Sequence, residues 1–225
     1  MDASCVVFDI DDTLYLERDY VRSGFRAVGE WARARLGIAD FAERSWRLFE
    51  AGVRGSIFDD VLTESGVQPD RALVRALVDV YRTHEPAIEM LPDAADAVGR
   101  LRGHVALAAL SDGPLESQRA KAHALRVGDW AEVTVFTAEL GAGFGKPDPR
   151  AFEVVERRVA CGPSGCVYVA DNPAKDFAGP RGRGWRTVRV RREGALHAGI
   201  DSGSDVDLEV ADLVGLEDGL TLPRS

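Results

Sequence analysis

The sequence has few of the residues that build a disulfide framework or a zinc site. Its 225 residues include three cysteines and four histidines, and neither type recurs at the spacing of a metal-binding motif. A small, odd number of cysteines in a chain of this length indicates reduced thiols rather than a disulfide scaffold. We therefore expect neither a zinc centre nor a fold stabilised by disulfides.

Long apolar runs and an excess of positive charge are also missing. No apolar stretch approaches the roughly 18 residues of a membrane-spanning helix, and no basic segment followed by an apolar one opens the chain, as in a secretion signal. The 37 acidic and 28 basic residues give a net charge of −9, which argues against nucleic acid and anionic membranes as partners. We expect a cytoplasmic protein, a monomer or a homodimer, with no nucleic-acid or membrane partner.

One stretch near the start combines an apolar segment with acidic residues. Residues 5–8 are apolar, and Asp9, Asp11, Asp12 and Thr13 follow closely. A short apolar run of this kind is typical of a strand buried on both faces of a parallel sheet. Because a buried carboxylate needs a cation or donors to offset its burial, we expect Asp9 and Asp11 to line the ligand crevice at the carboxyl end of the strand. Asp12 is expected to be solvated.

Helical periodicity dominates the next part of the chain. Apolar residues recur every three to four positions in the segments 19–36, 41–49, 57–65 and 70–84, which predicts four amphipathic helices. No strand pattern interrupts them. We therefore interpret residues 16–88 as an all-helical insertion.

Alternating strands and helices return after the insertion. Strands are predicted over 105–110, 133–136, 167–170 and 187–190, with an edge strand over 208–211, and prolines at 92, 114, 149 and 173 open the intervening helices. This alternation predicts an α/β fold, a Rossmann-like doubly wound parallel sheet. The core would comprise residues 1–15 and 89–225, with the helical insertion as a second domain.

Polar residues end several of these strands and would meet at one edge of the sheet. They are Asp9, Asp11 and Thr13; Ser111 and Asp112; Lys146 in a loop; and Asp171 and Asp176. Carboxylates suit a hard cation such as Mg²⁺, which commonly bridges to phosphate. Lysine and hydroxyl groups complement phosphoryl oxygens. The pattern therefore indicates a site for Mg²⁺ and a phosphoryl group.

Four motifs in order resemble those of the haloacid dehalogenase-like superfamily, of its phosphatase kind. Residues 9–13 match the first motif, DxDxT; Ser111 follows an apolar strand; Lys146 stands between Gly145 and Pro147; and residues 171–176 match an acidic fourth motif. The motifs span nearly the whole chain. Dehalogenases of the superfamily lack the second acid, so Asp11 favours phosphate-ester chemistry.

The resemblance implies a role for each residue. Asp9 would be the nucleophile that forms an aspartyl-phosphate, and Asp11 would protonate the leaving oxygen and then activate water. Mg²⁺ would be held by the Asp9 carboxylate, the Asp11 backbone carbonyl and Asp171. The remaining site residues would bind phosphate or support the site: Ser111 and Lys146 on phosphoryl oxygens, Asp112 through backbone contacts, Asp176 beside Lys146 or the metal, and Thr13 either on phosphate or holding the turn.

The insertion resembles the family's helical cap, which implies that it closes over the site and contacts a small phosphorylated metabolite such as a nucleotide, flavin or sugar phosphate. Its many arginines and aromatic residues have two interpretations. They form either a pocket for an anionic or aromatic leaving group, or an ordinary aromatic core with solvated arginines. Tyr15 and Arg18 are the residues expected to face the substrate.

Two other functions are compatible with these motifs. A phosphomutase of the same superfamily would return the phosphate to a sugar instead of to water. A phosphoacceptor switch domain also combines acids, a hydroxyl and a lysine on a doubly wound sheet, but it would fill only about 100–150 residues. We therefore expect a Mg²⁺-dependent phosphatase that acts on a small phosphomonoester.

Overall fold

The computed structural model describes residues 3–220. The chain divides into two compact units. The unit that carries the four motifs, which we name the catalytic unit after the role that the resemblance implies, comprises the described residues up to Glu17 and from Ile88 onward. The helical unit comprises Arg18–Ala87. Each unit has its own core and is described by itself.

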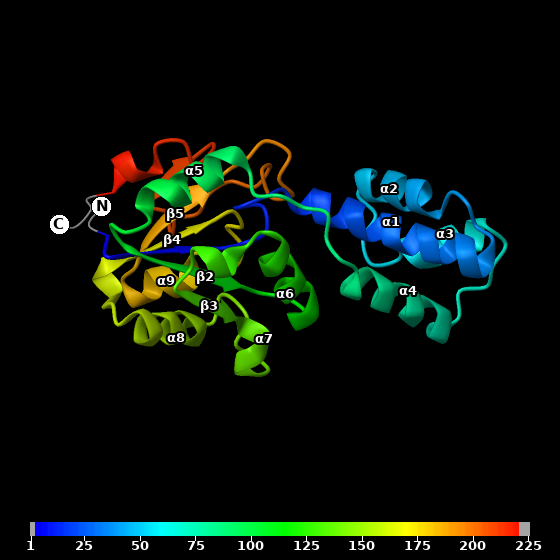
Figure 1. The fold of residues 1–225 in the computed structure, drawn as a ribbon, viewed down its shortest axis with the longest axis horizontal. Helices are drawn as coiled ribbons and strands as arrows, with labels where there is room; N and C mark the ends of the chain where they lie inside the picture. The colour runs from blue at the N-terminus through cyan, green and yellow to red at the C-terminus, as the bar shows by residue number, and fades with distance from the viewer. Residues whose placement is uncertain (1–2, 221–225) are drawn as a thin grey trace. The chain divides into compact units, whose positions relative to one another are not determined.

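A six-stranded, fully parallel sheet in the order β3-β2-β1-β4-β5-β6 forms the centre of the catalytic unit (Figure 1). This confirms the predicted α/β class. Along the chain the strands are β1 (Cys5–Phe8), β2 (Ala106–Ser111), β3 (Val133–Phe136), β4 (Cys166–Ala170), β5 (Arg186–Val190) and β6 (Leu208–Val210).

Helices cover both faces of this sheet, as the continuous apolar strands require. They are α5 (Pro92–Leu101), α6 (Leu115–Ala124), α7 (Thr137–Leu140), α8 (Pro149–Val159) and α9 (Ala178–Arg183). Figure 1 shows α5 and α8 on opposite sides of the sheet. Phe152 of α8 and the fully buried Trp185 pack against Tyr168 on one face.

The order of the strands determines where the site lies. β1 pairs with β2 on one side and with β4 on the other, so that Phe8 is level with both Ala109 and Val169. The chain leaves β1 toward β2 and later returns to its other side, which makes the carboxyl end of β1 a topological switch point. Asp9 directly follows β1 at this point.

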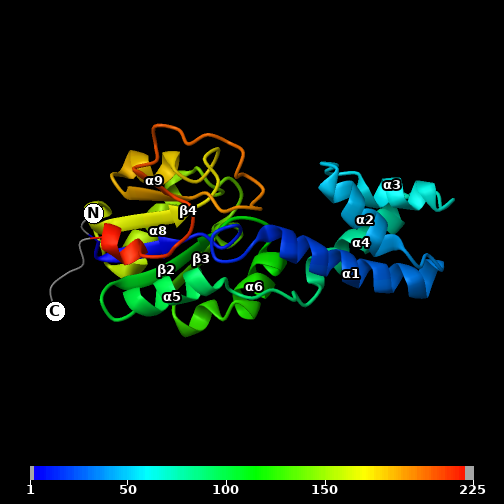
Figure 2. The same ribbon diagram turned by 90° about the horizontal axis from the view of Figure 1, so that it is seen from above.

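The helical unit contains α1 (Glu17–Leu36), which begins at the last residue of the catalytic unit, together with α2 (Phe41–Glu50), α3 (Ile57–Glu64) and α4 (Arg71–Thr83). Figure 2 shows the ribbons of α1, α2, α3 and α4. One residue from each helix is fully buried in a shared apolar core: Val28, Phe41, Leu62 and Leu77. A Cβ on Gly29 of α1 would lie 2.7 Å from the Cβ of Ala42, so glycine permits the close approach of α2.

One helix begins later than the sequence predicts. Pro173 was expected to open a helix, but α9 starts at Ala178. The backbone N–H of Asn172 donates to Asp176 Oδ2, and the Asn172 side chain accepts from Ala174 N. These side chains satisfy backbone groups that a helix would otherwise use, and they form a turn instead.

Two expectations, that the fold has no disulfide framework and no membrane-spanning helix, can be compared with the structure. Cys5, Cys161 and Cys166 are free thiols, two of them buried. Within residues 3–220, no helix combines the length and apolar character needed to cross a bilayer.

Candidate active site

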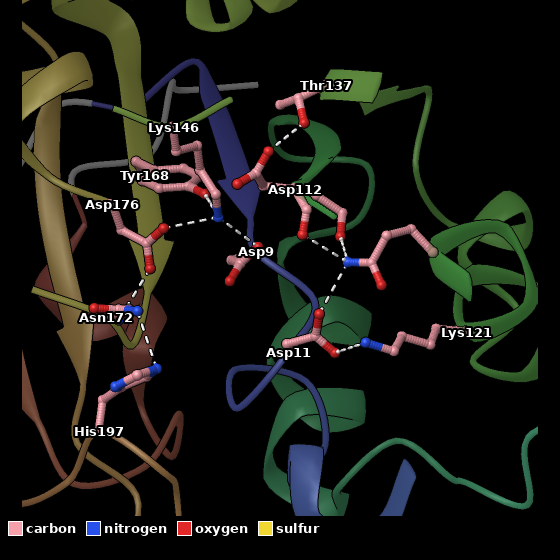
Figure 3. A network of polar contacts seen from close by, with 12 residues as sticks. Asp9, Asp11, Asp112, Lys121, Thr137, Lys146, Tyr168, Asn172, Asp176 and His197 are labelled. Carbon is pink, nitrogen blue, oxygen red and sulfur yellow. Dashed lines mark hydrogen bonds and ion pairs between the residues drawn. The ribbon is translucent and has the colours of Figure 1, made fainter. Parts of the chain in front are cut away.

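Lys146 joins two of the predicted acids at the carboxyl end of β1. Its Nζ lies 2.8 Å from Asp9 Oδ1 and 2.7 Å from Asp176 Oδ1, and it donates to Tyr168 Oη at 3.0 Å (Figure 3). Asp9 is 3% exposed and Asp176 is fully buried. Burial alone would lower the pKa of Lys146, but Asp176 and Asp9 raise it well above its ordinary value. Lys146 is therefore a permanent cation beside Asp9.

Asp171 completes an acidic cluster with Asp9 and Asp176. One carboxylate oxygen from each of the three buried residues lies within 4.8 Å of the other two. Burial, followed by repulsion from Asp176 and Asp9, raises the pKa of Asp171 to about 9. Burial also raises the pKa of Asp9 to about 6, against the lowering effect of Lys146. The cluster holds more negative charge than Lys146 alone offsets.

The donor set of this cluster fits a Mg²⁺ ion. The Asp171 Oδ2 atom is buried and has no hydrogen-bond partner among the described residues, although buried carboxylate oxygens are normally paired. Hard oxygen ligands in a small group suit Mg²⁺, which retains waters and accepts phosphate oxygens. Asp9 and Asp171 are two of the three predicted ligand residues. The predicted ligand on Asp11 is its backbone carbonyl, which remains a prediction.

Asp11 lies beside Asp9 but is held by a separate set of donors. Its Oδ1 accepts from Lys121 Nζ at 2.7 Å and from Tyr15 Oη at 2.5 Å, and its Oδ2 accepts from Gln118 Nε2 at 2.9 Å. Burial alone would raise the pKa of Asp11, but these donors, Lys121 above all, hold it below the ordinary value. Figure 3 shows Asp9 and Asp11 engaged with different partners.

The predicted phosphate-binding residues of β2 lie close to Asp11. The Ser111 hydroxyl is buried and accepts from Gln118 Nε2 at 2.5 Å. The Asp112 carbonyl accepts from the same amide at 3.1 Å, and its carboxylate accepts from Thr137. Thr13 Oγ1 is buried without a partner among the described residues. Phosphate binding by these residues remains a prediction.

The expectation that Asp12 is solvated is wrong. Asp12 is 1% exposed and adopts a positive φ of 52°, a conformation that Asp tolerates better than most residues. Its two carboxylate oxygens accept from the backbone N–H groups of Glu17 and Leu196. Asp12 therefore holds the turn after β1, a role that depends on a residue 184 positions away.

Sequence reasoning also missed Gln118 and Lys121, because neither belongs to a recognised motif. One signal was present: the chain has only three lysines, Lys121, Lys146 and Lys175, among 28 basic residues. Lys121 and Lys146 are both buried against acids of the site. Because the other basic residues of the chain are all arginine, a lysine indicates a position that requires a lysine side chain in particular.

The two residues expected to face the substrate have partners within their own units. The Tyr15 hydroxyl donates to Asp11 in the catalytic unit. In the helical unit, Arg18 forms an exposed ion pair with Glu50 at 3.2 Å and lies over the ring of Trp46. Phe25, Phe49 and Phe58 form part of the aromatic core of that unit. A role for Tyr15 or Arg18 in contacting substrate stays a prediction.

Solved structures share this fold over almost the whole chain. The HAD-hydrolase YfnB from Bacillus subtilis, solved with magnesium bound, is 18% identical with a TM-score of 0.68, covering 97% of this chain and 98% of that one. A HAD phosphatase from Thermococcus onnurineus is 21% identical with a TM-score of 0.62, covering 97% of each chain. At these identities the likeness shows the fold.

Sequence comparison extends this likeness to curated enzymes. A glyceraldehyde 3-phosphate phosphatase from Methanopyrus kandleri is 32% identical over 83% of each chain. A phosphoserine phosphatase from Thermus thermophilus is 31% identical over 86% of this chain and 68% of its own. The haloacid dehalogenase-like hydrolase family matches residues 3–182. The chain is therefore an enzyme of the haloacid dehalogenase-like hydrolase family, related to phosphatases.

Proposed function

We propose that this protein is a Mg²⁺-dependent phosphatase that hydrolyses a small phosphomonoester through an aspartyl-phosphate on Asp9. The observation that supports it most strongly is the separation of two neighbouring acids. Asp9 lies in a buried cluster with Asp171 and Asp176 beside Lys146, whereas Asp11 is held by other donors. Two acids in different surroundings suit two different roles.

In the first step, a carboxylate oxygen of Asp9 attacks phosphorus and the bond from phosphorus to the ester oxygen breaks. Asp11 must carry a proton for this step, although its donors favour the ionised carboxylate in the free protein, and it gives that proton to the leaving oxygen so that an alcohol departs. Lys146 and Ser111 donate to phosphoryl oxygens and stabilise the charge that develops there. Because Asp9 and the phosphate are both anionic, bound Mg²⁺ supplies charge neutralisation at the Asp9–Asp171 cluster.

In the second step, water attacks phosphorus while Asp11 takes its proton. The bond between phosphorus and the Asp9 oxygen breaks, which releases inorganic phosphate and regenerates the carboxylate. Asp176 acts through its 2.7 Å ion pair with Lys146, which keeps that ammonium directed at the site. Both half-reactions therefore use the same pair of acids.

The proposed substrate is a small phosphorylated metabolite. The relatives named above are a glyceraldehyde 3-phosphate phosphatase and a phosphoserine phosphatase. Both of those compounds therefore belong in the screen, beside the nucleotide, flavin and sugar phosphates expected from the sequence. The assignment of residues 16–88 to a cap domain is also a proposal, supported by their position between the first and second motifs. A cytoplasmic location and a monomeric or homodimeric state remain predictions from the sequence.

Phosphate release tests the proposal. We expect the purified chain to hydrolyse p-nitrophenyl phosphate with Mg²⁺, to lose this activity in EDTA and to regain it when Mg²⁺ is restored. A screen of single phosphorylated metabolites should then identify the natural substrate class by the highest kcat/KM. Isomerisation of a sugar phosphate without release of phosphate would support a phosphomutase instead. A stable aspartyl-phosphate with no turnover would support a phosphoacceptor switch.

A further inference from the structure

Helix α6 presents two buried polar side chains to the site. Gln118 and Lys121 are 2% and 4% exposed, and their spacing of three residues places them on one face of the helix. Both lie outside the four motifs that define the proposed active site. The exposed Arg119, between them in sequence, instead pairs with Glu139 at 2.7 Å.

Gln118, Lys121 and Tyr15 together occupy most of the acceptor positions of Asp11. A carboxylate offers about four lone-pair positions for hydrogen bonds, and these three donors fill three of them. Donors on both oxygens fix the rotation of the carboxyl group, since any rotation would break at least one short contact. About one position is left for exchange of a proton with a leaving group or a water.

Gln118 also connects Asp11 with the predicted phosphate-binding hydroxyl. The same amide nitrogen lies 2.5 Å from Ser111 Oγ and 2.9 Å from Asp11 Oδ2. When Ser111 Oγ accepts a hydrogen bond from Gln118, its own proton is directed away from that amide. The Ser111 hydroxyl is then free to donate to a phosphoryl oxygen. One side chain thereby sets the orientation of two reacting-site groups.

Stability alone does not account for this arrangement. Taking a lysine and a carboxylate out of water is costly, and a buried ion pair is often no more stabilising than apolar residues of similar volume. The Lys121 ammonium and the Asp11 carboxylate have side-chain exposures of 5% and 17%. Retaining this pair at the carboxyl end of β1 is therefore better explained by orientation of Asp11.

We propose that Gln118 and Lys121 are positioning residues that hold Asp11, and through Gln118 also Ser111, for proton transfer to the leaving oxygen. This inference rests on the proposed phosphatase function. It concerns α6, a helix that contains none of the four sequence motifs. It predicts that the kinetic effect of a substitution depends on the leaving group of the substrate. Loss of either side chain should matter most where the leaving group needs a proton.

The test compares aryl phosphates that differ in their leaving group. p-Nitrophenolate leaves readily without a proton, whereas phenolate is a poorer leaving group that depends on general-acid assistance. We expect Lys121→Met and Gln118→Leu to reduce kcat/KM for phenyl phosphate about 10-fold or more beyond their effect on p-nitrophenyl phosphate. Lys121→Arg should restore part of the difference. Arg119→Met, on the same helix, is the matched control and should show no leaving-group dependence.

A second comparison places the effect on Asp11 itself. If Lys121 acts through Asp11, Lys121→Met should add no leaving-group dependence to an Asp11→Asn variant. Equal losses on both substrates, or an additive effect in the double variant, would overturn the inference. A wild-type protein that releases no phosphate from either substrate would instead refute the proposed function. Mg²⁺ affinity measured by titration should be the same in Lys121→Met and the wild type, which separates the effect from metal loss.

Discussion

Within residues 3–220, every buried Asp, Lys and Arg side chain lies in the catalytic unit, whereas the helical unit buries apolar side chains and three polar ones, Ser23, Ser45 and His84. The helical unit follows the usual rule that amphipathic helices bury an apolar face. The catalytic unit departs from it at the carboxyl end of β1. Burying charged groups lowers the free energy of unfolding. Their concentration in the catalytic unit therefore indicates that the functional site lies there.

The two units also differ in net charge. Residues 18–87 contain eleven arginines, no lysine and eleven acidic residues, so the whole net charge of −9 belongs to the rest of the chain. Burial first, and then repulsion from Asp176 and Asp9, raises the pKa of Asp171 in the catalytic unit. A cation at Asp9 and Asp171 would relieve that repulsion. The helical unit has no comparable need.

The largest effect that we expect is the loss of activity in the Asp9→Asn variant. Removing the nucleophile should lower kcat about 10⁴-fold or more, the scale seen when a covalent nucleophile is deleted. The measurement is steady-state release of phosphate with saturating Mg²⁺. Asp79→Asn, an exposed carboxyl in the helical unit, is the matched control and should keep wild-type kcat. A kcat for Asp9→Asn within tenfold of the wild type would contradict the assignment.

The second prediction concerns stability in the helical unit. Leu77→Ala removes a fully buried side chain from its core, and such changes cost about 2–5 kcal/mol. Hydrogen exchange should show faster opening of peptides from residues 18–87, while Mg²⁺ affinity of the catalytic unit stays unchanged. Arg75→Ala, exposed on the same helix, serves as the control. Equal loss of protection around β1 would show that the two units do not fold independently.

The third prediction concerns Mg²⁺ binding. Asp171→Asn replaces an unpaired carboxylate with a weaker, neutral ligand and should lower Mg²⁺ affinity about 10²-fold, a scale known for residues that support metal sites. Without metal, the variant should be at least as stable as the wild type at pH 7. The reason is that a folded pKa of about 9 lies above that of the unfolded chain, so stability declines as pH rises above the unfolded value. Asn removes that penalty.

Calorimetric titration of Mg²⁺ and thermal unfolding without Mg²⁺ check both parts of this prediction. Asp129→Asn, an exposed carboxyl of the catalytic unit, should change neither quantity. An Asp171→Asn variant with wild-type Mg²⁺ affinity would exclude Asp171 as a ligand.

The smallest expected effect is the pH dependence of Mg²⁺ binding. Between about pH 6 and pH 9 the metal-free protein carries a proton on Asp171, and below about pH 6 also on Asp9. Because a ligand must lose its proton to bind metal, affinity should rise about tenfold per pH unit toward pH 9. Titrations in buffers of different ionisation enthalpy should show release of about one proton at pH 7.5. Affinity independent of pH, with no proton release, would contradict the coupling.

Those parts of the fold and site that depend on local sequence could be predicted. The apolar run before Asp9 and the alternation of strands and helices after residue 89 predicted the parallel sheet. Each strand or helix in that pattern is recognised from residues that are close together in the sequence. Lys146 and Asp176 were expected near each other, and their 2.7 Å ion pair confirms this. Motif order, not composition, made these predictions specific.

Long-range pairing explains the errors and omissions. Asp12 is buried because Leu196 N reaches it from a loop near the end of the chain, and nothing near Asp12 in the sequence signals that contact. Lys121 meets Asp11 only because α6, which follows β2, brings its side chain to the residues after β1, 110 positions back along the chain. The late start of α9 has a local cause instead: the backbone N–H of Asn172 donates to Asp176, four residues on, and this turn competes with the helix signal of Pro173.

The central claim is that Asp9 carries the phosphoryl group during turnover. Acid quenching during hydrolysis of p-nitrophenyl phosphate, followed by borohydride reduction and peptide mapping, tests it directly. The account predicts modification of Asp9 in the wild type, none at Asp11, and none anywhere in Asp9→Asn. Modification of a different residue, or sustained turnover by Asp9→Asn, would contradict it.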